Sequence, residues 1–417
     1  MLLGHLKSKN AARASRGSFE PLSILATSRG SLEPSPADLV AAADALGPKL
    51  SERAAQTEAN RALPRETMND LHAAGLLRYF VPRRYGGYEM DWGVQIQVGR
   101  TLAHYCASTA WIACVVGSHS AYVARMNPQA QDDVWKTKSD TLISTGSVMR
   151  NVSVAEVDGG YRLNGRWSFS SGVDHADWVL MRASITNDHR QSYFLVPRED
   201  IAIEDDWRVS GMSGTGSKSA AIKDAFVPTY RVISMTQMMA PNPPGAAANA
   251  SIVSSASFRL FAGSALLGPI VGGAEAVLNA FHALMREGAA GQDKEDPQAL
   301  LRIAEAAAEI GSAGRLADGL IERQLEAARS GAHVPKSIRI ANVLERTYAA
   351  RLCVNGAARL VNSLDAASLA QDAPIQRYYR DLLGMVQQIG VNWDRNMING
   401  AKAMFDLPTD IPDLNAD

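Results

Sequence analysis

The chain has 417 residues, of which 46% are hydrophobic and 20% charged, and its formal net charge is −1 at pH 7. This length is too great for one ordinary hydrophobic core, so we expect two or three packed domains of a globular protein. The balanced charge argues against binding to nucleic acid or to a membrane surface, because both require an excess of basic residues.

The cysteines and histidines indicate the compartment and argue against a metal centre. Cys106, Cys114 and Cys353 are widely spaced and form no CxxC pair, which is typical of a protein in the reducing cytoplasm. The eight histidines are scattered, and none has the spacing of metal ligands. We therefore expect neither a disulfide framework nor a bound metal.

The N-terminal third divides into a leader and a helical domain. Residues 1–33 are rich in Ser, Arg, Lys and Gly without a continuous apolar run, which predicts a poorly ordered leader rather than a secretory signal. Residues 34–138 carry helical periodicity with turn signals between the segments. Here Trp111 and His119 lie eight residues apart. They are either core residues or part of a site, where His119 would donate a hydrogen bond to a phenolate or an oxygen adduct.

Residues 139–235 change to a β-branched, hydroxyl-rich pattern that predicts a compact β-domain, such as a small barrel. The run 165–172, Gly-Arg-Trp-Ser-Phe-Ser-Ser-Gly, holds three hydroxyls and two aromatic rings within six residues. This mixture suits a flavin ring, because aromatic side chains cover its face and hydroxyls reach its polar edge. An ordinary strand with stacked aromatics is an equal alternative.

The Gly-rich run 211–219 resembles a phosphate-binding loop in composition only. Ser217 stands where the lysine of a GxxxxGK[ST] motif belongs, so this run is either an anion-binding turn or a plain turn between strands.

Residues 248–417 return to a helical pattern of four long amphipathic stretches, which predicts a bundle whose outer faces could support an oligomer. The most apolar window, residues 260–281, is interrupted by glycines, a proline and Glu275, which favours a buried helix over a membrane span. Arg259, just before this window, is in the Ser257-Phe258-Arg259 run that opens a long helix, and it could pair with a phosphate, although a surface arginine is commoner. Arg380 and Asp381 could tie helices together.

Several motifs, in this order, resemble the acyl-CoA dehydrogenase fold between about residues 35 and 405. They are Phe80-Val81-Pro82, Tyr85-Gly86-Gly87, Tyr161-Arg162-Leu163-Asn164-Gly165, Ala176-Asp177-Trp178, Phe226-Val227-Pro228 and Arg380-Asp381. The resemblance implies an α+β fold, mainly α, with an N-terminal helical domain, a central β-barrel and a C-terminal four-helix bundle. It also implies a homotetramer or dimer of dimers.

Within that superfamily, Trp111, His119, the run 167–172 and the run 214–217 resemble the flavin-dependent monooxygenase branch. Its members are oxygenase components of two-component systems that act on p-hydroxyphenylacetate, secosteroid phenols, indoles or dibenzothiophene. The resemblance implies that reduced FMN or FAD comes from a separate flavin reductase and reacts with O2 as co-substrate. The resulting C4a-hydroperoxyflavin would hydroxylate a phenol-like or indole-like aromatic or heteroaromatic small molecule.

Two alternatives stay open: an acyl-CoA dehydrogenase-like flavin oxidoreductase and a flavin-free binding member of the fold. Dehydrogenases often carry a catalytic Glu shortly after the Arg-Asp pair. Here residues 387–390 read Gln-Gln-Ile-Gly, and the next carboxylate is Asp394. Family branches that place the Glu elsewhere keep the first alternative open.

The resemblance also assigns roles by position. Ser171 would hydrogen-bond the N5/O4 edge of the flavin, Arg259 would pair with its phosphate, within one subunit or across a subunit interface, and His119 would face the substrate. The residues that would line or touch the flavin are Trp111, Ser144, Thr145, Ser147, Trp167, Phe169 and Ser170.

The last helices differ from several relatives, which carry a catalytic histidine there. This chain has Gln388 and Asn392 at those positions, and a glutamine cannot act as a general base at neutral pH. Either the catalytic histidine of the relatives corresponds to another position of this chain, or the substrate needs no phenol deprotonation. Indole-like, amine or sulfur substrates fit the second reading.

Overall fold

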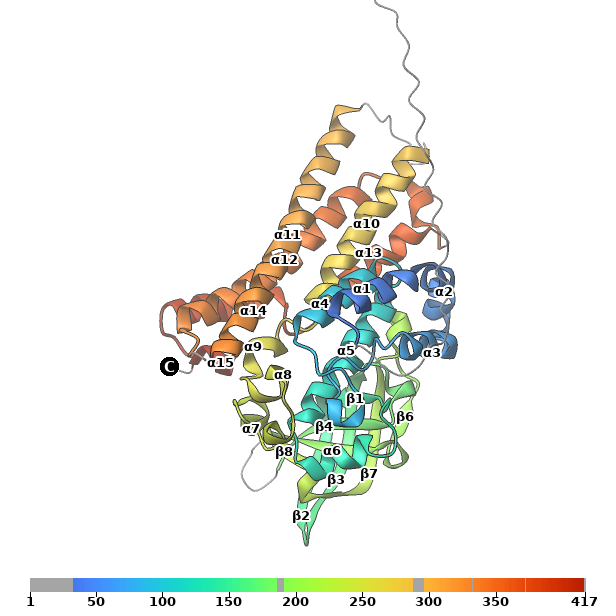
Figure 1. The fold of residues 1–417 in the computed structure, drawn as a ribbon. Helices are drawn as coiled ribbons and strands as arrows, with labels where there is room; N and C mark the ends of the chain where they lie inside the picture. Colours follow the sequence, from blue (N-terminus) through green and yellow to red (C-terminus); the bar gives the residue numbers. More distant parts are fainter. Residues whose placement is uncertain (1–32, 186–190, 288–295, 332, 372, 416–417) are drawn as a thin grey trace, which may run out of the picture. The chain divides into compact units, whose positions relative to one another are not determined.

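The computed structural model describes residues 33–185, 191–287, 296–331, 333–371 and 373–415. The expected leader therefore lies outside the described residues, apart from Glu33. Residues 34–417 form one unit, in which helices come first, strands follow and helices return (Figure 1). The first helices are α1 (Pro36–Ala45), α2 (Gly47–Asn60), α3 (Arg65–Ala73), α4 (Gly93–Ala103), α5 (Ala107–Ala124) and α6 (Pro128–Trp135).

Helix α5 is the buried centre of the N-terminal region. Its sequence is apolar or small on every side, which is typical of a helix enclosed by other elements. Fifteen of its eighteen residues are buried, and it contacts α4, α10 and the strand β1 (Ile143–Gly146). Side chains on α5 therefore reach both the strands and the bundle.

The central region contains two four-stranded sheets, with strand orders β1-β4-β5-β8 and β2-β3-β7-β6. β1 pairs with β4 in parallel, and the other pairs are antiparallel. Gly159, with φ +74°, lies in the expected Asp-Gly turn between β2 and β3. The remaining strands are β2 (Val148–Val157), β3 (Gly160–Ser170), β4 (Trp178–Ser184), β5 (Gln191–Pro197), β6 (Ala202–Glu204), β7 (Lys218–Pro228) and β8 (Val232–Ser234).

These sheets correct the expectation of a closed barrel. Each has its own edge strands, and the two pack against each other through an apolar layer that includes Leu163, Trp167, Met181 and Phe194. The outer face of the β1-β4-β5-β8 sheet packs against α5 and α6 through a second apolar cluster. Sheet-on-sheet packing of this kind encloses a core without barrel closure.

The C-terminal region is built on four long helices that pack together as a bundle (Figure 1). These are α10 (Leu267–Glu287), α11 (Pro297–Ser330), α12 (Lys336–Val361) and α13 (Pro374–Met385). Shorter helices flank them: α7 (Met235–Met239), α8 (Ile252–Ser255), α9 (Arg259–Ala262), α14 (Trp393–Met404) and α15 (Pro412–Asn415). The stretch Arg259–Arg286 is long and apolar enough to cross a membrane, but 67% of its most apolar window is buried. It packs as the core helix of the bundle.

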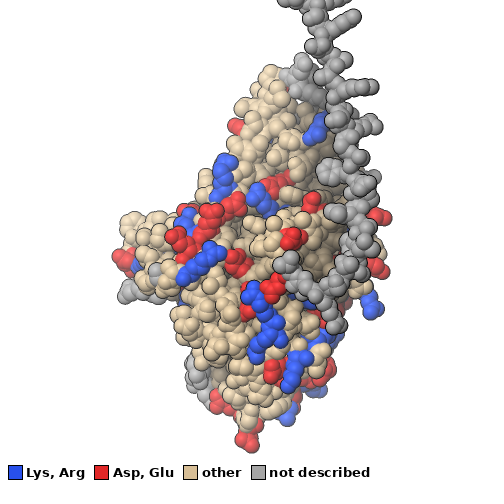
Figure 2. All heavy atoms as spheres, in the orientation of Figure 1, with Lys and Arg blue, Asp and Glu red and all other residues tan. Residues whose placement is uncertain are grey.

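Paired charges join the helical regions. Glu275 on α10 accepts hydrogen bonds from Arg100, through Nε at 2.9 Å and through Nη2, and it also contacts His104 Nε2 at 2.8 Å. Both partners come from the α4 segment. On the face drawn in Figure 2, basic and acidic side chains of the described residues are interspersed and form no large patch of one sign.

Candidate functional site

A cavity of about 590 Å³ lies where α5, the strands, the α9–α10 junction and the end of α13 meet. The structure brings seven of the sequence-predicted site residues to its wall: Trp111, His119, Thr145, Ser147, Phe169, Ser171 and Gln388. The wall also includes residues that the sequence reasoning did not assign to the site, among them Tyr122, Arg182, Trp207, Met212, Thr215, Ser217, Leu266 and Ile389. A mainly apolar enclosure with a few hydroxyls has the character and size of a small-molecule site.

The other predicted site residues do not line this cavity. Trp167 is fully buried between the sheets and donates from Nε1 to the Arg182 carbonyl at 2.7 Å. Ser170 is fully buried, and its hydroxyl has no partner among the described residues. Asn392 caps α14 by accepting from the Arg395 amide at 3.1 Å. Ser144 does not line the cavity but holds a residue that does, since its Oγ donates to the Ser171 carbonyl at 2.8 Å.

Arg259 is exposed and lines a separate cavity of about 650 Å³, together with Arg339, Arg346 and His333. Helix α9, which begins at Arg259, lies between the two cavities, because Ala262 at its end faces the first one. A single chain therefore does not bring Arg259 to the residues around Ser171.

Phe169 enters the cavity wall through a backbone irregularity. Its φ is +64°, a left-handed conformation that is uncommon for a residue with a side chain. The register of β3 against β7 shifts between Trp167 and Ser170, which marks a bulge at this point. The bulge leaves the Phe169 side chain 55% exposed, while Trp167 stays in the core. Strain held in this way is frequent at functional sites.

Ser171 is held on both its backbone and its side chain. Ser144 binds its carbonyl, and the neighbouring Gly172 amide donates to the Thr215 carbonyl at 3.0 Å. Its hydroxyl lies 2.7 Å from that of Ser217, which lies 2.7 Å from that of Thr215. The Thr215 hydroxyl donates in turn to the Met212 carbonyl at 2.8 Å. A connected row of hydroxyls thus lines one side of the cavity.

His119 is neutral and has a fixed tautomer. Its Nδ1 lies 2.8 Å from the Ile143 carbonyl, which can only accept, so Nδ1 carries the hydrogen. Burial lowers the pKa of His119 to about 4, although the bond to Ile143 opposes this shift. Nε2 is therefore a hydrogen-bond acceptor at neutral pH. This geometry corrects the expectation that His119 would donate to an anion.

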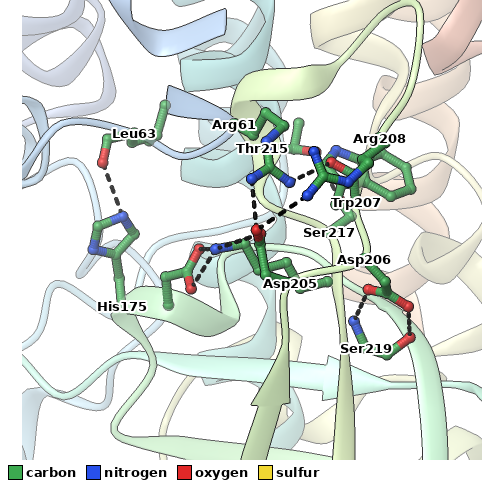
Figure 3. Close-up of polar contacts among 12 residues, drawn as sticks. Arg61, Leu63, His175, Asp205, Asp206, Trp207, Arg208, Thr215, Ser217 and Ser219 are labelled. Carbon is green, nitrogen blue, oxygen red and sulfur yellow. Dashed lines mark hydrogen bonds and ion pairs between the residues drawn. The ribbon is translucent and has the colours of Figure 1, made fainter. Parts of the chain in front are cut away.

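Trp207 closes the cavity beside Phe169 and is held in place by a polar cluster (Figure 3). Its indole nitrogen donates to the Met212 carbonyl at 3.1 Å, and its own carbonyl accepts from Arg61 at 3.2 Å. Arg61 also pairs with Asp205 at 2.6 Å, tying this loop to the end of α2. The sequence distance of about 145 residues between these partners explains why local patterns did not reveal them.

In α13, Asp381 anchors the Gly-rich turn, and Arg380 ties α13 to helix α2. Asp381 Oδ1 accepts from the Met212 amide at 2.5 Å, and Arg380 pairs with Glu58 on α2 at 2.6 Å. A Cβ on Gly211 would lie 2.1 Å from the Arg380 carbonyl, so only glycine allows this approach. Burial, reinforced by Glu58, raises the pKa of Asp381 to about 6 against the opposing bond from Met212.

Gln388 reaches the cavity wall with its carbonyl oxygen already used. Oε1 accepts from the Gly390 amide at 2.5 Å. The amide nitrogen is left as the polar group that Gln388 can offer, and it is a donor. Among the described residues that line the cavity, none carries a carboxylate.

Comparison with protein families identifies two matching segments. Residues 40–137 match the acyl-CoA dehydrogenase N-terminal domain, and residues 265–393 match the acyl-CoA dehydrogenase C-terminal domain. These segments are the helical regions on either side of the sheets.

Individual relatives narrow the comparison. The chain is 35% identical to the flavin-dependent monooxygenase oxygenase subunit HsaA of Rhodococcus jostii (strain RHA1), over 81% of this chain and 90% of the relative. It is 31% identical to the oxygenase component of the FADH(2)-dependent resorcinol hydroxylase of Rhizobium sp. (strain MTP-10005), over 82% and 87% of the two chains. Among solved structures, 3-HSA hydroxylase from Rhodococcus sp. RHA1 superposes with a TM-score of 0.85 at 32% identity, covering 90% of this chain and 98% of that one.

Proposed function

Because this chain belongs to the family of flavin-dependent monooxygenase oxygenase subunits, which has the acyl-CoA dehydrogenase fold, we propose a specific reaction for it. It takes reduced FMN or FAD from a separate flavin reductase and uses O2 to hydroxylate a small aromatic molecule. Bound reduced flavin supplies the electrons that activate O2. The chain's residues bind, orient and shield the reactants.

The cavity fits such a flavin. Trp111, Phe169 and Trp207 offer apolar surface for the faces of a planar ring, and the Ser171 hydroxyl offers a partner for its polar edge. An apolar enclosure also excludes water, which limits wasteful release of H2O2.

The described cavity wall has no carboxylate, and this observation decides between hydroxylation and dehydrogenation as the reaction. Dehydrogenation of an acyl thioester requires a base that removes a proton from carbon, and Asp or Glu is the usual group for this task in the fold. Hydroxylation of an aromatic ring needs no such carboxylate. This observation favours the oxygenase over the acyl-CoA dehydrogenase-like alternative.

His119 supports a phenol as the substrate. Its neutral Nε2 can accept the hydroxyl hydrogen of a phenol inside a cavity whose described lining residues carry no carboxylate. A base at Gln388 or Asn392 is then unnecessary, and the difference from relatives in the last helices does not exclude phenols. An indole N–H could use the same acceptor, so indole-like substrates remain the second choice.

Arg259 would bind the flavin phosphate from a neighbouring subunit. Its exposure on a cavity with Arg339 and Arg346 supports this proposal, because guanidinium groups suit phosphate. The arrangement requires an oligomer, and we propose a homotetramer working in the cytoplasm, where the three buried free cysteines would stay reduced.

Reconstitution tests the function. The purified chain is supplied with a generic flavin reductase, NADH, FMN or FAD, and a panel of phenols and indoles. We expect a hydroxylated phenol that carries 18O when 18O2 is used. Bleaching of protein-bound oxidised flavin by an acyl-CoA, without any hydroxylated product, would instead support the dehydrogenase-like alternative.

A further inference from the structure

The hydroxyls of Ser171, Ser217 and Thr215 form a row that begins at the cavity and ends at the Met212 carbonyl. Each oxygen–oxygen separation is 2.7 or 2.8 Å, the ordinary length of an O–H···O hydrogen bond. At these distances a hydrogen must lie between each pair, since two oxygens without one repel each other. The directions of the bonds can therefore be assigned.

The assignment starts at the carbonyl, which has no hydrogen to give. Thr215 must donate its only hydroxyl hydrogen to Met212, so its oxygen can only accept from Ser217. Ser217 then has no hydrogen left for Ser171, and Ser171 must donate to Ser217. Ser171 consequently presents lone pairs, and no hydrogen, to the cavity.

Burial makes this polarity stable. Thr215 is 2% exposed and Ser217 is 5% exposed, so water cannot readily replace either bond. The Ser171 backbone is also fixed, by Ser144 and through the Gly172 amide. Reversing the row would leave the Thr215 oxygen facing the Met212 carbonyl without a hydrogen between them.

The edge of a flavin offers different partners in its two redox states. Nitrogen N5 carries a hydrogen in reduced flavin and is a bare acceptor in oxidised flavin, whereas oxygen O4 is an acceptor in both. An acceptor at Ser171 therefore complements only the N5–H of the reduced form. Opposite oxidised flavin, it would place lone pairs against lone pairs.

We infer that Ser217 and Thr215 are positioning residues: the row Ser171–Ser217–Thr215–Met212 fixes Ser171 as an acceptor, and this polarity sets how strongly the site prefers reduced over oxidised flavin. The inference rests on the proposed function.

The test measures the ratio of the two dissociation constants, oxidised over reduced, for FMN and for FAD under anaerobic conditions. The wild-type ratio exceeds one. Ser217→Ala leaves the Ser171 hydroxyl without its acceptor, so it can turn its hydrogen toward the cavity. The ratio then falls about tenfold, the factor given by one hydrogen bond of roughly 1.4 kcal/mol. The midpoint potential of bound flavin falls by about 30 mV for a two-electron couple.

Thr215→Val tests the direction of the Ser171 hydrogen bond without removing the Ser171–Ser217 contact itself. It removes the hydroxyl at the far end of the row, which lets Ser217 donate to Ser171 and Ser171 donate into the cavity. The ratio falls as it does in Ser217→Ala, although both serines are intact. Thr215→Ser and Ser217→Thr keep a hydroxyl and keep the wild-type ratio.

Ser213→Ala is the matched control, because its buried hydroxyl lies in the same turn but donates to the Val209 carbonyl, outside the row. A wild-type ratio in folded Thr215→Val or Ser217→Ala protein overturns the inference and leaves the proposed function intact. A wild-type chain that binds neither redox state of FMN or FAD overturns the proposed function itself.

Discussion

Phe169 and Trp207 meet edge to face at the cavity, with ring centroids 5.8 Å apart and ring planes at 89°. The contact joins the bulge at the end of β3 to the loop after β6, and both rings line the cavity. An aromatic pair in this geometry contributes about 0.5–1.5 kcal/mol beyond the area it buries. The pair therefore sets both the width of the site and the position of a loop.

Phe169→Ala and Phe169→Gly remove the same ring but differ in backbone strain. Both should raise the ratio of H2O2 to hydroxylated product, because a wall of the cavity opens to water. Glycine accepts the φ of +64° that alanine resists, so Phe169→Gly should be more stable than Phe169→Ala by about 0.5–1 kcal/mol. Chemical denaturation measures the difference. Equal or reversed stabilities would show that this conformation carries no strain.

The ion pair between Arg61 and Asp205 should control the loop more than the global stability. Arg61→Met keeps the apolar stem and removes the bonds to Asp205 and to the Trp207 carbonyl. Partly exposed pairs contribute about 1 kcal/mol or less, so the melting temperature should change little. The KM for the aromatic substrate and the H2O2 fraction should both rise, by about threefold to tenfold in KM for roughly 0.7–1.4 kcal/mol.

Arg208→Met is the matched control for that change. Arg208 pairs with the same carboxylate at 3.7 Å, but its side chain is 71% exposed. It should leave KM and coupling near wild-type values. Equal effects of the two substitutions would mean that net charge, and not the hold on Trp207, matters at this rim.

The sequence motifs predicted the order of helices and strands, because periodicity and turn residues are local properties. Seven of the predicted site residues, including His119 and Ser171, lie in the wall of one cavity. The motifs failed where the backbone departs from regular alternation. Regular alternation places Trp167 and Phe169 on one face of a strand, but the bulge turns Phe169 to the cavity and leaves Trp167 in the core.

Contacts between segments that are distant in the sequence were the second feature that the sequence motifs could not predict. Arg61 and Trp207 meet only after α2 and the strand region pack together, and no local pattern reports that contact. The polarity of His119 likewise depends on the Ile143 carbonyl, 24 residues away. A sequence shows which side chains can donate or accept hydrogen bonds. The direction of each hydrogen bond can be assigned only when the partner of that side chain is known.

His119→Asn tests the acceptor role of Nε2. The asparagine amide can still donate to the Ile143 carbonyl, but the acceptor that faces the cavity is lost. We expect kcat/KM for a phenol to fall about 100-fold, at the lower end of general acid–base contributions, with flavin affinity unchanged. A loss of flavin binding without loss of turnover at saturating flavin would move His119 from substrate to flavin.

The pH dependence of stability gives a second measurement on the same residue. The folded pKa of about 4 lies below the ordinary 6.5, so the folded state holds His119 neutral while the unfolded chain binds a proton. The stabilising contribution is present above pH 6.5 and is lost as pH falls toward 4. His119→Asn should show a weaker decline of the unfolding free energy across that window. An identical decline would assign it to other groups.

Arg259→Ala should weaken the binding of reduced FMN about tenfold and leave reduced riboflavin unaffected. The two ligands share the ring and differ by the phosphate, so riboflavin is the control for the ring site. High salt should reduce the wild-type preference for FMN, since the pairing is with an exposed arginine. Equal weakening for both ligands would show that Arg259 acts on the fold or assembly instead of the phosphate.

Asp381 should destabilise the folded protein when it is ionised, despite its hydrogen bond to Met212. Its folded pKa of about 6 lies above the ordinary 3.8, with burial as the main cause. Stability from this group is therefore full below pH 3.8 and is lost as pH rises through 6, by about 3 kcal/mol for a shift of about two units. Asp381→Asn keeps an oxygen that can accept from Met212 and removes the charge. We expect it to match or exceed wild-type stability at pH 8, while Asp381→Ala, which leaves the Met212 amide unpaired, is less stable at every pH.

Unfolding free energies of the three proteins at pH 5 and pH 8 show whether the ionised carboxylate destabilises the fold. An Asn variant as unstable as the Ala variant at pH 8 would mean that the ionised carboxylate of Asp381 itself stabilises the Gly-rich turn.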